Sequence, residues 1–235
     1  SSRSCNQSKF SMKNNLVSIG YIAKGRMKEG VDALFKKKNL KISSRDRQLF
    51  GYLKKYPNVR INYMSAKQIV NSLGAGICDI AITGIDLWKE SEPSVQSKIK
   101  MIKKYDFAKA ELSVCVPSIW LDVTNPTDLE EISYEFYNKK KRLMRVATGF
   151  KNLSREWFDS KGITQYEIID AQSSVELFPW IGKSDVIVDL VSTGFTLKQN
   201  NLKKLSTICK SSACLFAAKN SMKKKEVKKI IKLFT

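Results

Sequence analysis

Residues 185–200 read DVIVDLVSTGFTLKQN, and this stretch decides the fold class. Its first half is a nearly continuous apolar run, which predicts a buried strand that delivers Asp189 to its end. A turn of small residues follows at Ser192, Thr193 and Gly194. Open α/β sheets bind ligands at the carboxyl ends of their strands, so the pattern indicates an α/β sheet with a ligand loop.

The same alternation of strand and helix extends along the chain. Apolar runs predict strands over 16–23, 59–64, 78–82, 112–116, 143–147, 166–169 and 186–191, with further strand-like positions in 203–219. Helical spacing predicts helices over 27–38, 66–73, 87–90, 153–160 and 174–180, and a terminal helix that opens at 221–226. Residues 118–142 are linker-like, with Pro126 at a helix N1 position.

These elements form two groups, which predicts two α/β lobes with a cleft between them. We expect a flexible lead-in over residues 1–15 and a first lobe over 16–116, which about 213–235 rejoin. The second lobe is expected over 117–212 and carries the Ser192–Gly194 turn.

The composition limits the ligands. The 235 residues carry 42 Lys and Arg against 22 Asp and Glu, a net charge of +20, so the surface attracts anions. The lysines are spread along the chain without an Arg-rich or aromatic-interleaved motif, which favours phosphorylated small molecules over nucleic acid. No apolar run approaches the roughly 20 residues that a membrane-spanning helix needs.

The chain contains no histidine, which excludes Ser-His and Cys-His nucleophilic catalysis and histidine-ligated metals. A metal would therefore be a hard cation of the magnesium type, held by carboxylates and substrate oxygens. The five cysteines form no CxxC pair, and residues 1–11 lack the apolar core of a secretory signal. These features favour a reducing, cytoplasmic location.

Two further strand ends carry turns of the same kind. Lys24-Gly25-Arg26 follows the first strand, and Thr83-Gly84-Ile85-Asp86 follows the third. Each turn alone is also compatible with ordinary helix capping by Ser, Thr or Asp. Cations at a helix start oppose the helix dipole, however, and this favours an anionic ligand near Lys24 and Arg26.

The order of these motifs resembles the ATP phosphoribosyltransferase family. The resemblance rests on KGR, DIAITGIDL, VATGFKNLSREWFDSKGI and SSVELFPWIGKSDVIVDLVSTGFTLKQNNL, and covers roughly residues 16–220. The chain resembles the short, catalytic-subunit form, which works with a regulatory subunit related to histidyl-tRNA synthetase. The resemblance implies a two-lobed fold like that of type II periplasmic binding proteins, in a homodimer or hetero-oligomer.

The resemblance also implies an activity, the Mg²⁺-dependent transfer of phosphoribosyl from phosphoribosyl pyrophosphate to N1 of ATP. Asp189 would then meet the ribose hydroxyls, and Glu176 would make ribose or magnesium-linked contacts. Lys24 and Arg26, with Gly25 between them, would contact pyrophosphate or triphosphate. The 5-phosphate loop would be Ser192, Thr193, Gly194, Phe195 and Thr196, and the first-lobe ligand loop Thr83, Gly84 and Asp86. Asp189, Glu176 and Arg26 are the residues expected to take part in catalysis.

Three departures from the family pattern raise an alternative. Phe195 stands where the phosphate loop usually has a threonine, and Glu111 stands where an arginine is usual. Ser65 and Gln68 lie where an Arg and an Asp are expected. The alternative is a weakened or inactive homologue that serves as a nucleotide-binding or assembly subunit. A solute-binding protein of the same fold is disfavoured by the phosphate loop.

Overall fold

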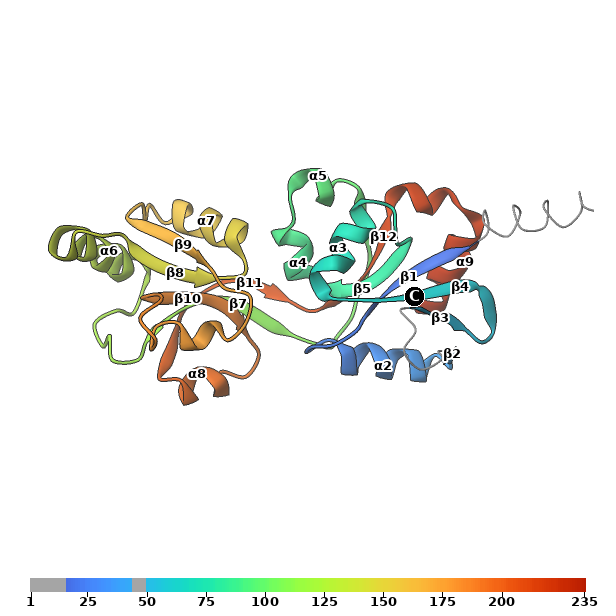
Figure 1. Ribbon diagram of the computed structural model, residues 1–235, viewed down its shortest axis with the longest axis horizontal. Coiled ribbons are helices and arrows are strands. Elements are labelled where there is room, and N and C mark those ends of the chain that lie inside the picture. Colours follow the sequence, from blue (N-terminus) through green and yellow to red (C-terminus); the bar gives the residue numbers. More distant parts are fainter. Residues whose placement is uncertain (1–15, 44–49) are drawn as a thin grey trace, which may run out of the picture. The chain divides into compact units, whose positions relative to one another are not determined.

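The computed structural model describes residues 16–43 and 50–235, so the expected lead-in over 1–15 lies outside the described residues. The chain divides into two compact units. The first unit runs to Ala108 and resumes over Ser212–Thr235, and the second comprises Lys109–Ser211. Each unit contains its own mixed sheet and its own helices (Figure 1).

The first unit is built on a sheet of order β2-β3-β4-β1-β5-β12-β6. Its strands are β1 (Val17–Ile22), β2 (Ile42–Ser43), β3 (Phe50–Leu53), β4 (Tyr56–Met64), β5 (Ile80–Gly84), β6 (Ile99–Lys104) and β12 (Ala213–Ala218). Strands β4, β1 and β5 are parallel neighbours, and every residue of β1 is buried. Their carboxyl ends therefore meet at one edge of the sheet.

Helices cover both faces of this sheet because the side chains of β1 alternate between the faces. Tyr21 contacts Phe35 of α2, which packs on Phe234 of α9, while Gly20 faces Ile69 of α3. The helices of the unit are α2 (Lys28–Lys37), α3 (Ala66–Gly74), α4 (Ile85–Glu90), α5 (Pro93–Gln96), η2 (Lys219–Lys223) and α9 (Lys225–Phe234).

The second unit is built on a sheet of order β11-β7-β10-β8-β9. Its strands are β7 (Ala110–Pro117), β8 (Met144–Thr148), β9 (Tyr166–Asp170), β10 (Val186–Val191) and β11 (Leu202–Ser211). Its helices are α6 (Pro126–Lys140), α7 (Lys151–Ser160), η1 (Val175–Leu177) and α8 (Phe195–Gln199). Strands β10, β8 and β9 run parallel, so the turns that follow them share one edge.

Several elements differ from the sequence-based expectation. Residues 110–116 were assigned to the first lobe, yet β7 lies in the second sheet, where it pairs with β10 and β11. Residues 118–142 are not a linker, because 126–140 form helix α6 of the second unit. Pro126 does stand in its first turn, behind an Asn125 cap that accepts from the Asp128 N–H. The strands β2, β3 and β6 and the helix α5 were missed.

Helix α6 shows why the linker interpretation was wrong. Its apolar stripe is weak, and its last turn is basic. Its buried positions are widely spaced, at Leu129, Ser133 and Phe136. The Ser133 hydroxyl donates to the Glu130 carbonyl, which allows a polar side chain to be buried in a helix. Such a pattern carries little periodic hydrophobic signal.

Candidate functional site

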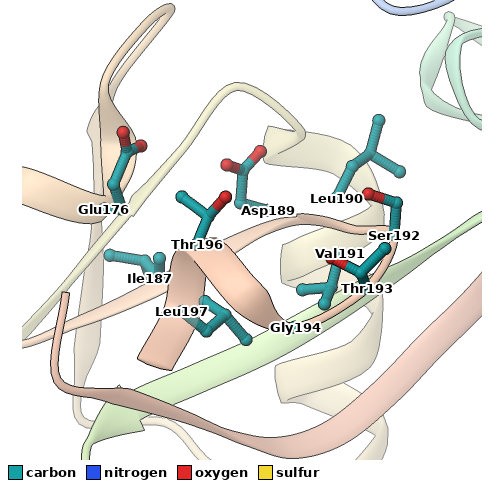
Figure 2. Close-up of a pocket in the computed structure, with 10 residues that line it drawn as sticks. All are labelled: Glu176, Ile187, Asp189, Leu190, Val191, Ser192, Thr193, Gly194, Thr196 and Leu197. Atoms are coloured by element: carbon teal, nitrogen blue, oxygen red, sulfur yellow. The ribbon is translucent and has the colours of Figure 1, made fainter. Parts of the chain in front are cut away.

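The turn after β10 lines a pocket in the second unit, together with one side chain from η1. The lining residues are Glu176, Ile187, Asp189, Leu190, Val191, Ser192, Thr193, Gly194, Thr196 and Leu197. Figure 2 shows the two carboxylates and the Thr196 hydroxyl on one side of this group, and Ile187 and Leu197 on the other. The pocket thus combines an apolar floor with acids and hydroxyls, as ligand sites do.

Asp189 is the electrostatic centre of the pocket. It lies on β10 opposite Ser113 of β7, and it is largely buried. Burial raises its pKa to about 6, the Leu190 N–H opposes that rise, and the charge of Glu176 adds to it. Asp189 is therefore an anion at neutral pH that lacks full solvation, and it will favour donors such as hydroxyl groups.

The turn itself presents hydroxyls around a left-handed glycine. Gly194 has φ +75°, a conformation that disfavours any side chain, although the space around it is open. The Phe195 N–H donates to Thr193 Oγ1 over 3.4 Å, so this turn is closed by its own hydroxyl. Ser192, Thr193 and Thr196 are exposed, which leaves their hydroxyls accessible to a ligand.

Phe195 does not occupy the pocket that its neighbours form. It is absent from the lining residues, and its side chain is 63% exposed. The expectation that its ring adds bulk within the phosphate loop is therefore wrong for the second unit. As the first residue of the short helix α8, it points its side chain to solvent while its N–H stays in the turn.

Glu176 reaches the pocket from a shorter element than expected. The sequence predicted a helix over 174–180 capped by Ser173, but the structure has a 3-10 turn over Val175–Leu177. Ser174 precedes it with φ +51° and makes no side-chain cap. This tight turn places the Glu176 carboxylate near Asp189, whose pKa it raises.

The predicted Mg²⁺ site has two protein carboxylates at most. Within 16–43 and 50–235, no group of three Cys, Asp or Glu side chains is arranged to hold a metal. Asp189 and Glu176 face the same pocket, and the mutual repulsion of their charges is what a cation would relieve. Magnesium commonly takes one or two carboxylates together with substrate phosphates and water, so this pair fits the ion.

The first unit carries the two other predicted loops at one edge of its sheet. Lys24, Gly25 and Arg26 follow β1, and all three are exposed. Gly25 has φ +101°, which requires glycine, and its carbonyl accepts the Lys28 N–H over 3.1 Å as α2 begins. The guanidinium of Arg26 donates from Nη1 to the Ala108 carbonyl.

The second loop of the first unit is more deeply buried. Thr83 and Asp86 are 2% and 1% exposed, so the structure places both below the surface. A Cβ on Gly84 would collide with Oδ1 of Asp86 and would lie 3.4 Å from Cε of Met27. Glycine is therefore needed at 84 to seat Asp86, and Met27 connects this loop to the Lys24–Arg26 loop.

The departures from the family pattern have local explanations. Glu111 lies on β7, where it accepts hydrogen bonds from Lys204 over 2.7 Å and Thr207 over 3.1 Å. These donors lower its pKa, and its negative charge is paired. Ser65 and Gln68 form a capping box, in which each side chain accepts the other residue's N–H, and this box begins α3.

Some residues near the pocket were missed by the sequence analysis. The apolar floor of Ile187 and Leu197 looked like ordinary core. At the same sheet edge, Lys151 of α7 forms an ion pair with Asp170 at the end of β9, with 3.0 Å between Nζ and Oδ2. Their sequence signal was a Lys at a helix start and an acid at a strand end, which is the pattern used for the other loops.

The chain matches a family model described as ATP phosphoribosyltransferase over residues 65–235. An ATP phosphoribosyltransferase from Agrobacterium fabrum is 35% identical over 209 residues, which cover 87% of this chain and 91% of that protein. One from Rhizobium meliloti is also 35% identical, over 210 residues and with the same coverage.

Solved structures agree on the fold. An ATP phosphoribosyl transferase (HisG:HisZ) complex from Thermotoga maritima has a TM-score of 0.70 at 24% identity, and the match covers 93% of this chain and 95% of that one. A probable amino-acid ABC transporter extracellular-binding protein from Bacillus subtilis has a TM-score of 0.52 at 15% identity, over 92% and 91%. The predicted α/β fold of the periplasmic-binding-protein type is thus confirmed.

Proposed function

Because this chain belongs to the ATP phosphoribosyltransferase family, we propose that it transfers phosphoribosyl from phosphoribosyl pyrophosphate to N1 of ATP and releases pyrophosphate. That reaction is the first step of histidine biosynthesis. The residues that surround the β10 turn support this activity, and they also indicate how each part of the donor substrate would be held.

The observation that carries the proposal is the pairing of Asp189 with the Ser192–Thr196 turn in one pocket. We assign the hydroxyls of Ser192, Thr193 and Thr196, with the N–H groups of the turn, to the 5-phosphate. Such turns supply the donors that a phosphate needs. Asp189 is assigned to the ribose hydroxyls, which donate to its carboxylate while it is ionised.

The chemistry needs positioning and charge stabilisation more than a strong base. As the bond from ribose C1 to pyrophosphate breaks, positive charge develops on the ribose and negative charge on the leaving group. The carboxylates of Asp189 and Glu176 favour the positive charge. Lys24 and Arg26 are assigned to pyrophosphate or triphosphate, whose negative charge they offset. Such a reaction is consistent with a chain that contains no histidine.

We propose Mg²⁺ as the cofactor, with Asp189 and Glu176 as its protein ligands. When bound, the ion would offset the charge of the pyrophosphate oxygens. The pair also explains the raised pKa of Asp189, because two carboxylates that face one pocket repel each other unless a cation is present.

For partners and location we propose a homodimer or a hetero-oligomer with a histidyl-tRNA-synthetase-like regulatory subunit, in the cytoplasm. The solved relative whose description names a HisG:HisZ complex supports the second form. Within the described residues no helix is long and apolar enough to cross a membrane.

The weakened homologue loses the observations that suggested it. Phe195 extends to solvent, Glu111 is paired with Lys204, and Ser65 with Gln68 caps α3. These substitutions have local structural explanations that do not require loss of the ligand. We therefore favour the active enzyme.

The test is an assay of ATP with phosphoribosyl pyrophosphate and Mg²⁺, with and without candidate regulatory subunits. We expect phosphoribosyl-ATP in at least one pairing, and its absence from all of them would overturn the proposed activity. Calorimetric titration with ribose 5-phosphate then tests the pocket. Thr196→Val should weaken that binding, whereas Thr164→Val, which alters an exposed threonine far along the chain from the turn, should not.

A further inference from the structure

The segments that connect the two units are hydrogen-bonded to each other within the first unit. The chain leaves this unit after Ala108 and returns at Ser212. The Ala213 N–H donates to the Phe107 carbonyl over 3.1 Å, and the Tyr105 N–H donates to the Ala213 carbonyl over 2.8 Å. We call residues 105–108 the outgoing segment and residues 212–213 the returning segment.

Each segment also holds one of the two ligand loops of the first unit. Arg26, in the loop after β1, donates from Nη1 to the carbonyl of Ala108 in the outgoing segment. Ile85, in the loop after β5, donates its N–H to the carbonyl of Ser212 in the returning segment, over 3.2 Å. The conformation of the connecting segments and the geometry of the ligand loops are therefore coupled.

Ala108 has an uncommon backbone conformation for its residue type. Its φ is +53°, in the left-handed region that costs a side-chain-bearing residue free energy. Packing next to it holds the outgoing segment, because the ring of Phe107 lies where a Cβ on Gly30 would be. Gly30 is thus a helix-interior glycine of α2 that admits Phe107. The strained residue is the one whose carbonyl accepts from Arg26.

We propose that Ala108 is a positioning residue, which acts through Arg26 to aim the guanidinium at the anionic part of a substrate. This rests on the proposed role of Arg26 in binding pyrophosphate or triphosphate. A guanidinium that donates from Nη1 to a fixed carbonyl keeps its other edge, Nε with Nη2, for two parallel bonds to a phosphate. Ser212 does the same for the backbone of the Gly84–Asp86 loop.

The consequence is a dependence of anion affinity on a backbone angle distant from any ligand contact. When Ala108 leaves the left-handed region, its carbonyl turns away and Arg26 loses its support. The anion must then order a mobile side chain on binding, which lowers the affinity. Conversely, a bound anion stabilises the left-handed state of Ala108, because such coupling is reciprocal.

The test varies the side chain at 108 and measures calorimetric binding of inorganic pyrophosphate. Glycine adopts a positive φ freely, alanine at a cost, and valine rarely. We expect Ala108→Val to weaken pyrophosphate binding by about threefold to tenfold, and Ala108→Gly to bind at least as tightly as the wild type. Ala75→Val is the matched control, since Ala75 is exposed with φ −83°.

Two further readouts separate the explanations. Ribose 5-phosphate, assigned to the second unit, should bind Ala108→Val as it binds the wild type, and an equal loss for both probes would indicate general damage and overturn the positioning role. Equal pyrophosphate affinity for Gly, Ala and Val at 108 would also overturn it. If wild-type protein binds no pyrophosphate, the assignment of Arg26 to that ligand fails.

Amide hydrogen exchange of the ligand-free protein decides the contact itself, whatever the binding result. Arg26→Gln should accelerate exchange of the Ala213 N–H, which donates to the outgoing segment, and should leave the β10 amides unchanged. Unchanged exchange at Ala213 in Arg26→Gln would show that Arg26 does not hold the segment.

Discussion

The β10 turn and the two loops of the first unit occupy equivalent edges of their sheets but differ in how they hold their acids. In the second unit Asp189 lines an open pocket, and its pKa is raised to about 6. In the first unit Asp86 is buried beneath Gly84, and the exposed charges are the cations of Lys24 and Arg26. The same motif of strand, glycine turn and acid therefore serves ligand chemistry in one unit and loop architecture in the other.

The strongest challenge to this contrast is removal of the Asp189 charge. Asp189→Asn keeps the shape of the side chain but replaces an anion with an amide. We expect kcat/KM to fall by about 10²- to 10³-fold, because a charge at the reacting sugar is worth that much in the transition state. Steady-state kinetics with both substrates measure the loss, and Asp122→Asn, at an exposed acid, is the control.

The same substitution should make the folded protein more stable. The folded-state pKa of Asp189 is raised, so the folded state binds its proton more tightly than the unfolded state does. Its stability contribution therefore falls as pH rises from about 4 to about 6 and stays low above that window. From the pKa of about 6, we expect Asp189→Asn to raise the free energy of unfolding by roughly 3 kcal/mol at pH 7.5.

Urea denaturation at a series of pH values measures this gain. The difference between variant and wild type should vanish below about pH 4, where the folded and the unfolded protein both carry a protonated Asp189. A pH-independent difference would mean that the carboxylate is not the cause. Loss of activity together with a gain in stability is the expected signature of a functional acid.

The two turn glycines sharpen the comparison. Gly84→Ala should destabilise the protein by about 1–3 kcal/mol, because the new Cβ collides with the Asp86 carboxylate. Gly194→Ala meets no atom within 4 Å and should cost only the strain of φ +75°, about 1 kcal/mol. Thermal unfolding ranks the two, and a larger cost at Gly194 would contradict the assignment of Asp86 to a packed, architectural role.

The smallest expected effect is at Phe195. Since its ring is exposed and outside the pocket lining, Phe195→Thr should change the affinity for ribose 5-phosphate by less than about twofold. Calorimetry on the isolated chain measures this change. A marked tightening would mean that the threonine hydroxyl reaches the phosphate and that the turn rearranges on binding.

The sequence by itself determined the strongly periodic elements and the loop that follows β10. The bounds of β10 were predicted to the residue, since an apolar run between Asp185 and a small-residue turn allows little alternative. Asp189 and the Ser192–Thr196 turn are contiguous, so adjacency in the chain already placed them together. The family was identified for the same reason, from the order and spacing of local motifs.

Only the tertiary structure decided contacts between distant segments. Pairing with β10 and β11 moved β7 into the second unit, and Lys204 neutralised Glu111 from 93 residues away. The Arg26 contact with Ala108 likewise joins residues 82 positions apart. Sheet order and the burial of each side chain arise from the whole chain, so a local pattern predicts which strand carries an acid but not whether that acid faces a ligand or the core.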